Sequence, residues 1–285
     1  MDITLRAGKP DDSRECGRIC YEAFKSIADR HGFPPDFPSP EVAAMIVGSM
    51  LRHPRFYPVV AERSGQIAGS NFMDERCPIA GIGPISVDPN VQDSGIGKRM
   101  MLNALERAKE KKFAGVRLVQ SAYHMRSLSL YTKLGFDPRE TLSTFHGPAL
   151  NSRINGCQVR AAISSDLEAC NRLCDYVHGC DRGGELADAI EHRDATVVVR
   201  AGQITGYATS ISFGGHAVAE SNDDLKALIA APRELHPPGF LVPSRNGELM
   251  RWCLAQGLRI IMQMTLMSIG LYNEPRGAYL PSILY

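Results

Sequence analysis

The residues at positions 92 to 99 combine glycine, small polar and basic side chains. They read Gln92, Asp93, Ser94, Gly95, Ile96, Gly97, Lys98 and Arg99. They lie between a strand-like segment ending at Pro89 and a helix predicted over 98–112. Glycine lets the backbone come close to a ligand, and the first turn of a helix presents unpaired N–H groups at the positive end of its dipole. This layout is typical of a phosphate site.

A tyrosine with possible acid chemistry stands on a second segment. That segment reads Ser127-Leu128-Ser129-Leu130-Tyr131-Thr132-Lys133-Leu134-Gly135-Phe136. The leucines around Tyr131 follow helical spacing, so its side chain alone would be read as a core aromatic. A phenol can also donate a proton in general acid catalysis, and the residues of this segment alone do not decide between the two roles.

Together the two segments resemble motifs of the GNAT N-acetyltransferase superfamily. Gln92-x-x-Gly95-x-Gly97, after a strand ending Ile-Ser-Val-Asp-Pro, is similar to its pyrophosphate loop, and Leu-Tyr-x-Lys-Leu-Gly-Phe is similar to its later helix. The resemblance covers residues 1–146. It implies an acyl-CoA-dependent N-acyltransferase that uses acetyl-CoA (coenzyme A) and moves its acetyl group to an amine by direct attack.

The resemblance also assigns roles to residues. Ile85, Ser86 and Val87 are expected to bind the pantetheine arm and polarise the thioester carbonyl. Residues 92 to 99 are expected to hold the pyrophosphate, with the Asp93 side chain directed to solvent. Tyr131 takes the position of the acid. Further cofactor contacts are expected at Ser127 and at His124, where many relatives carry an asparagine.

The base and the acceptor site stay open in the sequence. Many relatives carry a glutamate on the strand before the tyrosine helix, but residues 116–120 contain none. Asp74 and Glu75, after a predicted hairpin, are candidates for the base and for binding a cationic substrate. In the second half of the chain, His216 is a candidate acceptor contact, together with Phe213 and Trp252.

The chain repeats itself. Leu5-Arg6-Ala7 matches Val159-Arg160-Ala161 at an offset of 154 residues (160 − 6), and the same offset aligns Asp12, Cys16 and Cys20 with equivalents in the second half. Three later matches keep the same order: 59–69 with 197–206, 118–121 with 241–244, and 141–142 with 265–266. A period near 150 residues indicates duplication of a whole domain.

The duplication predicts the domain organisation. We expect an N-terminal GNAT domain over 1–148 with the acetyl-CoA site, and a degenerate GNAT-like domain over 149–285. The fold class is α/β (α+β), with two tandem GNAT-like domains, each a mixed twisted sheet with helices on both faces. In the second copy, Ser221-Asn222-Asp223-Asp224 replaces the phosphate loop, and Cys253 stands where the first copy has its tyrosine (131 + 122 = 253).

Composition narrows the class of protein. A net charge of +1 and 44% hydrophobic residues give no reason to expect binding to nucleic acid or to a membrane. The first residues, Met1 to Arg6, lack the apolar core of a signal peptide, so we expect a cytoplasmic protein with reduced cysteines and no metal site. The apolar stretch 260–271 is too short to cross a bilayer and is predicted to be a buried strand.

These observations favour a small-molecule amine as the acceptor. Two alternatives remain: a protein or peptide N-acetyltransferase, and a module that binds acyl-CoA or another ligand without turnover. The chain could act as a monomer or a homodimer.

Overall fold

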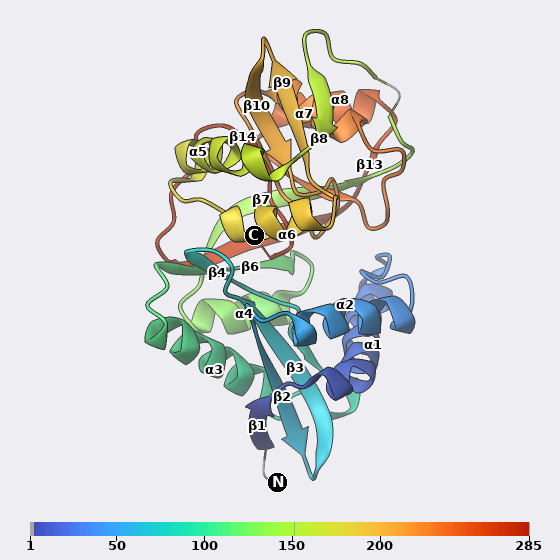
Figure 1. Cartoon of the computed structure of the whole chain (residues 1–285). Coiled ribbons are helices and arrows are strands. Elements are labelled where there is room, and N and C mark those ends of the chain that lie inside the picture. The colour runs from blue at the N-terminus through green and yellow to red at the C-terminus, as the bar shows by residue number, and fades with distance from the viewer. Residues whose placement is uncertain (1–2, 151, 285) are drawn as a thin grey trace.

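The computed structural model describes residues 3–150 and 152–284. Met1 and Asp2 of the N-terminal segment, Asn151 of the predicted domain boundary, and Tyr285 lie outside the described residues. Two sheets form the framework (Figure 1), and strands and helices follow one another in a similar order in the two halves of the chain. The α/β fold class is confirmed.

The first half contains β1 (Ile3–Ala7), α1 (Ser13–His31), α2 (Pro40–Arg52), β2 (Phe56–Arg63), β3 (Gln66–Asp74), β4 (Ile79–Ile82), β5 (Ser86–Val87), α3 (Ile96–Glu110), β6 (Gly115–Ser121), α4 (Met125–Lys133) and β7 (Asp137–His146). The second half contains β8 (Gln158–Ala161), α5 (Leu167–His178), α6 (Gly183–Glu191), β9 (Thr196–Arg200), β10 (Gln203–Ala208), β11 (Ala217–Ala219), α7 (Asn222–Ala230), β12 (Phe240–Pro243), α8 (Gly247–Ala255), β13 (Arg259–Gly270) and β14 (Ala278–Leu280).

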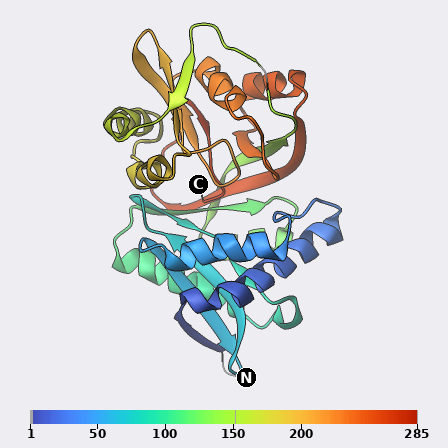
Figure 2. The ribbon, with the colours of Figure 1, turned by 45° about the vertical axis from the view of Figure 1, so that its right-hand side comes forward.

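Helices cover both faces of the first sheet. Helices α1 and α2 pack on one face, where Cys16 and Cys20 join Val60 and Phe72 in the core. Helices α3 and α4 pack on the opposite face (Figures 1 and 2). The second sheet, in the order β14-β11-β10-β9-β8, is covered in the same way by α5 and α6 on one face and by α7 and α8 on the other.

An ion pair is repeated at the start of each half. Arg6 binds Asp12 at 2.7 Å in the first half, and Arg160 binds Asp166 at 2.6 Å in the second. Each aspartate also accepts a hydrogen bond from the backbone N–H three residues before it. Asp12 stands at the N-cap of α1, but its carboxylate makes no capping hydrogen bond to that helix and binds the N–H of Lys9 in the preceding turn.

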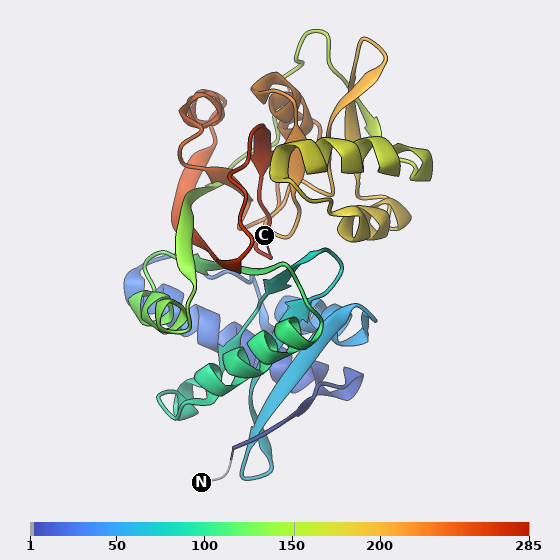
Figure 3. The same cartoon turned by 90° about the vertical axis from the view of Figure 1, so that its left-hand side faces the viewer.

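The two halves share strands. The first sheet runs β1-β2-β3-β4-β6-β13-β7-β12, so β13 of the second half lies between β6 and β7 (Figure 3). The repeated residues Thr141 and Thr265 are register partners in the antiparallel pair of β7 and β13. Equivalent strands therefore meet around an approximate two-fold axis, and the predicted boundary between residues 148 and 149 does not interrupt the sheet.

The apolar tail stretch forms a buried strand, as predicted. Met262, Met264 and Leu266 of β13 are all buried. No helix among the described residues has the length and apolar character needed to cross a membrane. Within the same residues, no group of three or more His, Cys, Asp and Glu side chains is arranged to hold a metal ion.

Candidate active site

A gap opens between two strands of the first sheet. Strands β4 and β6 run parallel and pair over Ile79–Gly81 and Gly115–Arg117, and the ladder of described residues goes no further. Beyond it β5 pairs with β3 instead, while β6 continues to Ser121. The facing edges of residues 83–87 and 118–121 are thus free to bind an extended ligand that carries amide groups, as strand edges do in peptide recognition.

The glycine-containing loop lies at one end of this gap. Gly95 has a φ of +83°, a conformation that favours glycine, and an added Cβ there would meet open space. Helix α3 begins at Ile96, two residues earlier than the sequence indicated, so the N–H groups of Ile96, Gly97 and Lys98 belong to its first turn and have no intrahelical acceptor. The geometry suits an anion.

A salt bridge holds the one acidic side chain of this loop away from such an anion. Asp93 is 81% exposed and binds Arg126 of α4 at 2.7 Å. As the sequence analysis expected, its carboxylate faces solvent. The basic side chains of Lys98 and Lys133 lie among the residues that line the cavity beside the loop.

Tyr131 lies in the cavity wall on α4. Its side chain is 6% exposed and its ring contacts Phe136 edge-on, with the ring centroids 6.2 Å apart. Burial raises the pKa of Tyr131 to about 12, an effect that a hydrogen bond with Ser127 partly opposes. The phenol therefore keeps its proton at neutral pH and can donate a hydrogen bond into the cavity.

His124 precedes the same helix. The Ser127 hydroxyl lies 2.6 Å from Nδ1 of His124. Burial, and to a lesser degree the nearby charge of Arg126, lower the pKa of His124 to about 4. The imidazole is neutral at pH 7, so it can serve in hydrogen bonding but brings no positive charge to the anion.

The cavity has a volume of about 1580 Å³, larger than the roughly 300–1,000 Å³ of common ligand sites. Most residues that the sequence singled out for cofactor binding and catalysis line it: Ile85, Ser86, Val87, Gln92, Asp93, Ser94, Gly95, Ile96, Gly97, Lys98, His124, Ser127 and Tyr131. Arg99 does not line it and lies exposed in the first turn of α3.

The three acceptor candidates lie elsewhere, each held by a partner. Asp74 is 4% exposed and binds Arg76 at 2.6 Å. Glu75 binds Arg107 at 2.7 Å. His216 is 1% exposed, with Nδ1 2.9 Å from a carboxylate oxygen of Glu185 in α6. None of the three lines the cavity. Their side chains are engaged in these contacts, which favours a structural role.

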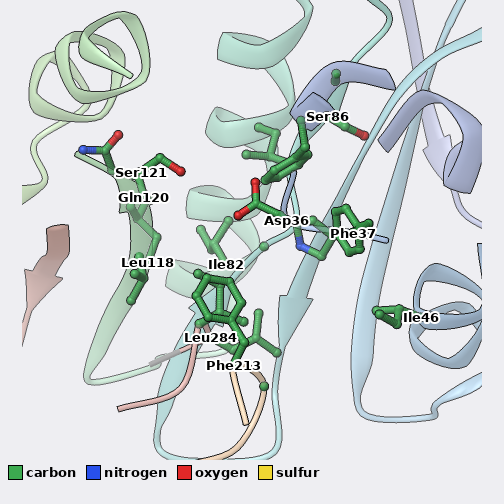
Figure 4. A pocket seen from close by; sticks show the side chains of 18 of the residues that line it. Asp36, Phe37, Ile46, Ile82, Ser86, Leu118, Gln120, Ser121, Phe213 and Leu284 are labelled. Atoms are coloured by element: carbon green, nitrogen blue, oxygen red, sulfur yellow. The ribbon is translucent and has the colours of Figure 1, made fainter. Parts of the chain in front are cut away.

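One candidate functional residue in the cavity that the sequence did not single out is Asp36. It lies between α1 and α2 in the Pro-rich run Phe33 to Pro40, which the second half lacks. Figure 4 shows its carboxylate directed into the cavity, toward the space between Ser86 and the strand that carries Ser121. In the sequence, Asp36 stands out as a single acidic residue among aromatic residues and prolines. Its enclosure in the cavity, however, depends on side chains from segments that are distant in the sequence.

The second half contributes walls to this cavity. Phe213 and Leu284 reach it from a loop after β10 and from the C-terminal segment (Figure 4). Of the three second-half side chains expected at the acceptor, Phe213 lines the cavity, His216 does not, and Trp252 packs against the core of the second half. The chamber beside the strand gap is therefore built from both halves.

In the second half, the segment equivalent to the glycine loop is a capped helix N-terminus at the start of α7. Ser221 caps α7 by accepting a hydrogen bond from the Asp224 N–H. The Asp224 carboxylate is buried and binds Arg200 at 3.0 Å and Thr205 at 2.8 Å. Its negative charge lies in the first turn of α7, where it disfavours an anion, and Cys253 is fully buried in the core.

Comparisons with known proteins agree with this geometry. The family model of the acetyltransferase (GNAT) family matches residues 21–136. A stretch of 65 residues is 34% identical to mycothiol acetyltransferase of Nocardia farcinica, covering 23% of this chain and 22% of that relative. The chain thus matches less than a quarter of the length of that protein.

Solved structures extend the similarity to both halves. A candidate acetyltransferase from Pyrococcus horikoshii superposes with a TM-score of 0.77 at 18% identity, over 97% of this chain and 92% of that one. A GCN5-related N-acetyltransferase from Sphaerobacter thermophilus gives 0.63 at 14% identity, over 95% and 96%. A tandem GNAT protein from the clavulanic acid biosynthesis pathway gives 0.58 at 14% identity, over 94% and 98%. These similarities show the fold.

Proposed function

We propose that this chain, whose residues 21–136 match the model of the acetyltransferase (GNAT) family, transfers the acetyl group of acetyl-CoA to an amine of a small molecule. The observation that carries the proposal is the gap between β4 and β6 that leads to the first turn of α3. An extended arm fits the open strand edges, and a diphosphate fits the free N–H groups of Ile96 to Lys98.

Bound acetyl-CoA supplies an activated acetyl group as a thioester. The chain holds the diphosphate end through the first turn of α3, where Lys98 adds positive charge. Residues 85–87 present backbone groups along the gap and orient the thioester. Tyr131 keeps its proton because its pKa is raised to about 12, so its hydroxyl can stabilise the developing thiolate by hydrogen bonding.

A small acceptor fits the chamber better than a macromolecule. Phe213 and Leu284 close the chamber from the second half, opposite Phe37 (Figure 4). The one curated relative described above is named for acetylation of mycothiol, a name that also supports a small-molecule acceptor. With a net charge of +1, the chain has no bulk charge to attract a charged polymer.

Replacement of Gly95 tests the assignment of the cofactor site. Gly95→Val should weaken CoA binding by at least about tenfold, which corresponds to about 1.4 kcal/mol, because a branched side chain would stand in the cradle and strain the positive φ. Gly65→Val is the matched control: Gly65 has a φ of +76°, equally open surroundings and a place in the β2–β3 turn.

Titration calorimetry with CoA measures binding, and thiol release from acetyl-CoA across a panel of amines measures transfer. We expect full binding by the Gly65 variant and wild-type protein. Equal binding by the Gly95 variant would place the cofactor somewhere else. Binding without thiol release for any amine or peptide would favour the binding-module alternative, and release with peptides alone would favour the peptide acceptor.

A further inference from the structure

The segment that carries Asp36 is fixed on both sides by aromatic contacts. The Phe33 ring stacks on Tyr123, which follows β6, with the centroids 4.2 Å apart. The Phe37 ring meets Phe24 of α1 edge-on at 5.5 Å. These two contacts anchor the chain before and after Asp36. The carboxylate is therefore held over the cavity rather than on a free surface loop.

Asp36 differs from the other carboxylates around the cavity because of its surroundings. Glu185 binds Arg182, and Asp188 binds Arg76. Asp93 and Asp194 are exposed. Among the described residues, Asp36 is the cavity carboxylate that is partly buried and has no ion-pair partner.

Apolar side chains lie on two sides of this unpaired carboxylate. Figure 4 shows Ile82, Leu284 and Phe213 below it and Phe37 beside it. Transfer of a charged group to such surroundings without a partner is costly. The position therefore suits a ligand that brings a positive charge on an apolar body.

The protonation of Asp36 responds to the same surroundings. Burial raises the pKa of Asp36 to about 6, an effect that a hydrogen bond from its own backbone N–H to the carboxylate partly opposes. Two titratable side chains interact with its charge, Cys20 of α1 and Tyr123 after β6. His124 lines the same cavity, and the ring of His31 contacts Tyr123. Within the described residues, neither α2 nor the loop 209–215 adds a titratable group to the cavity.

We propose that Asp36 binds the ammonium group of the acceptor and is the base that removes its first proton, and that the acceptor is a primary amine on a short apolar body. This inference rests on the proposed acetyl transfer. Two observations carry it: the anchored, unpaired carboxylate, and its place beside the strand gap where the thioester would lie.

The proton balance of the step is complete. The ammonium R–NH₃⁺ gives one proton to the Asp36 carboxylate, and the free amine attacks the thioester carbonyl carbon. The C–S bond breaks as the tetrahedral intermediate collapses. The second nitrogen proton passes to the sulfur, with the Tyr131 hydroxyl placed to relay it, and Asp36 returns its proton to solvent. The products are the acetamide, CoA thiol and one released proton.

Asp36→Asn tests the base with 2-phenylethylamine as the acceptor and acetyl-CoA as the donor. At pH 7 the variant should lose about 10²- to 10⁴-fold in kcat/KM for the amine, the range typical of a missing general base, while CoA affinity stays unchanged. Asp194→Asn, which removes an exposed carboxylate at the cavity rim, is the matched control and should behave as wild type.

The pH profile separates a base from a merely structural residue. Wild-type kcat/KM should fall as the pH drops below about 6, because protonated Asp36 cannot accept a proton. Asp36→Asn should lack this limb, and its deficit should shrink as the pH approaches the amine pKa, where free amine is present in solution. Asp36→Glu should restore part of the activity.

A binding measurement gives a result even without turnover. Asp36→Asn should weaken binding of 2-phenylethylamine at least about tenfold and leave binding of neutral 2-phenylethanol unchanged. Equal affinity of wild type and variant for the ammonium probe, or equal pH profiles, would overturn the role of Asp36. If wild-type protein does not bind CoA, the acetyl-transfer proposal itself is overturned, so the two failures are distinguishable.

Discussion

Asp36→Asn should stabilise the folded protein at neutral and alkaline pH. The folded-state pKa of Asp36 is about 6, whereas an unperturbed aspartate has a pKa of about 3.9. A difference of about two pH units at 1.36 kcal/mol each gives about 3 kcal/mol. Because the folded pKa is the higher one, the ionised carboxylate disfavours the folded state, and this cost is absent below about pH 4 and complete above about pH 6.

Urea denaturation at pH 4.5 and pH 8 measures the effect. The variant should exceed wild type in free energy of unfolding by up to about 3 kcal/mol at pH 8, reduced by the cost of burying an amide, and by much less at pH 4.5. Asp194→Asn, at an exposed site, should show no comparable change between the two pH values. A pH-independent difference for Asp36→Asn, or a loss of stability at pH 8, would refute the reasoning that this carboxylate is desolvated and unpaired.

Two further variants test the acid and the shared strand. Tyr131→Phe should lower kcat for thiol release by about 10²- to 10⁴-fold and change the free energy of unfolding by less than about 1.5 kcal/mol, because the ring keeps its packing. The control Tyr57→Phe, which removes a hydroxyl bound to Asn103 at 3.2 Å, should keep full activity. Unchanged turnover in the Tyr131 variant would show that Tyr131 is not the acid. Leu266→Ala should lower the free energy of unfolding by about 2–5 kcal/mol, because the side chain is fully buried on β13. The control Leu254→Ala, at a 47% exposed position on α8, should lower it by less than about 1 kcal/mol. Similar losses for the two variants in urea titrations would contradict the central place of β13.

The sequence predicted the features that depend on local chemistry. The loop around Gly95 requires a positive φ and a helix start, and both requirements leave a visible mark in residue type. The repeat aligned Arg160 and Asp166 with Arg6 and Asp12, and the structure shows the same ion pair at both places. The strand over 260–271 was visible from its continuous apolar run.

The acceptor side could not be predicted in the same way. Asp74 and Glu75 look available in the sequence, but Arg76 and Arg107 neutralise them. Arg76 lies two residues after Asp74, so its pairing could have been anticipated from the sequence, whereas Arg107 comes from α3. Asp36 gains its raised pKa from walls provided by distant segments, and no local pattern reports that enclosure.

Strand sharing gives the second half a structural role in this fold, although it lacks the glycine loop of the first half. Strand β6 forms one edge of the cofactor gap, and β13 covers its other edge over Gly115 to Ser121. Strand β7 pairs with β13 and β12, both from the second half. The Asp224 network can replace an anion site without disturbing these pairings, because it lies at the start of α7 on the other sheet. Changes in β13 would instead reach the gap directly through β6. We therefore expect the second half to tolerate loss of its own chemistry while the buried positions of β13 remain sensitive to substitution.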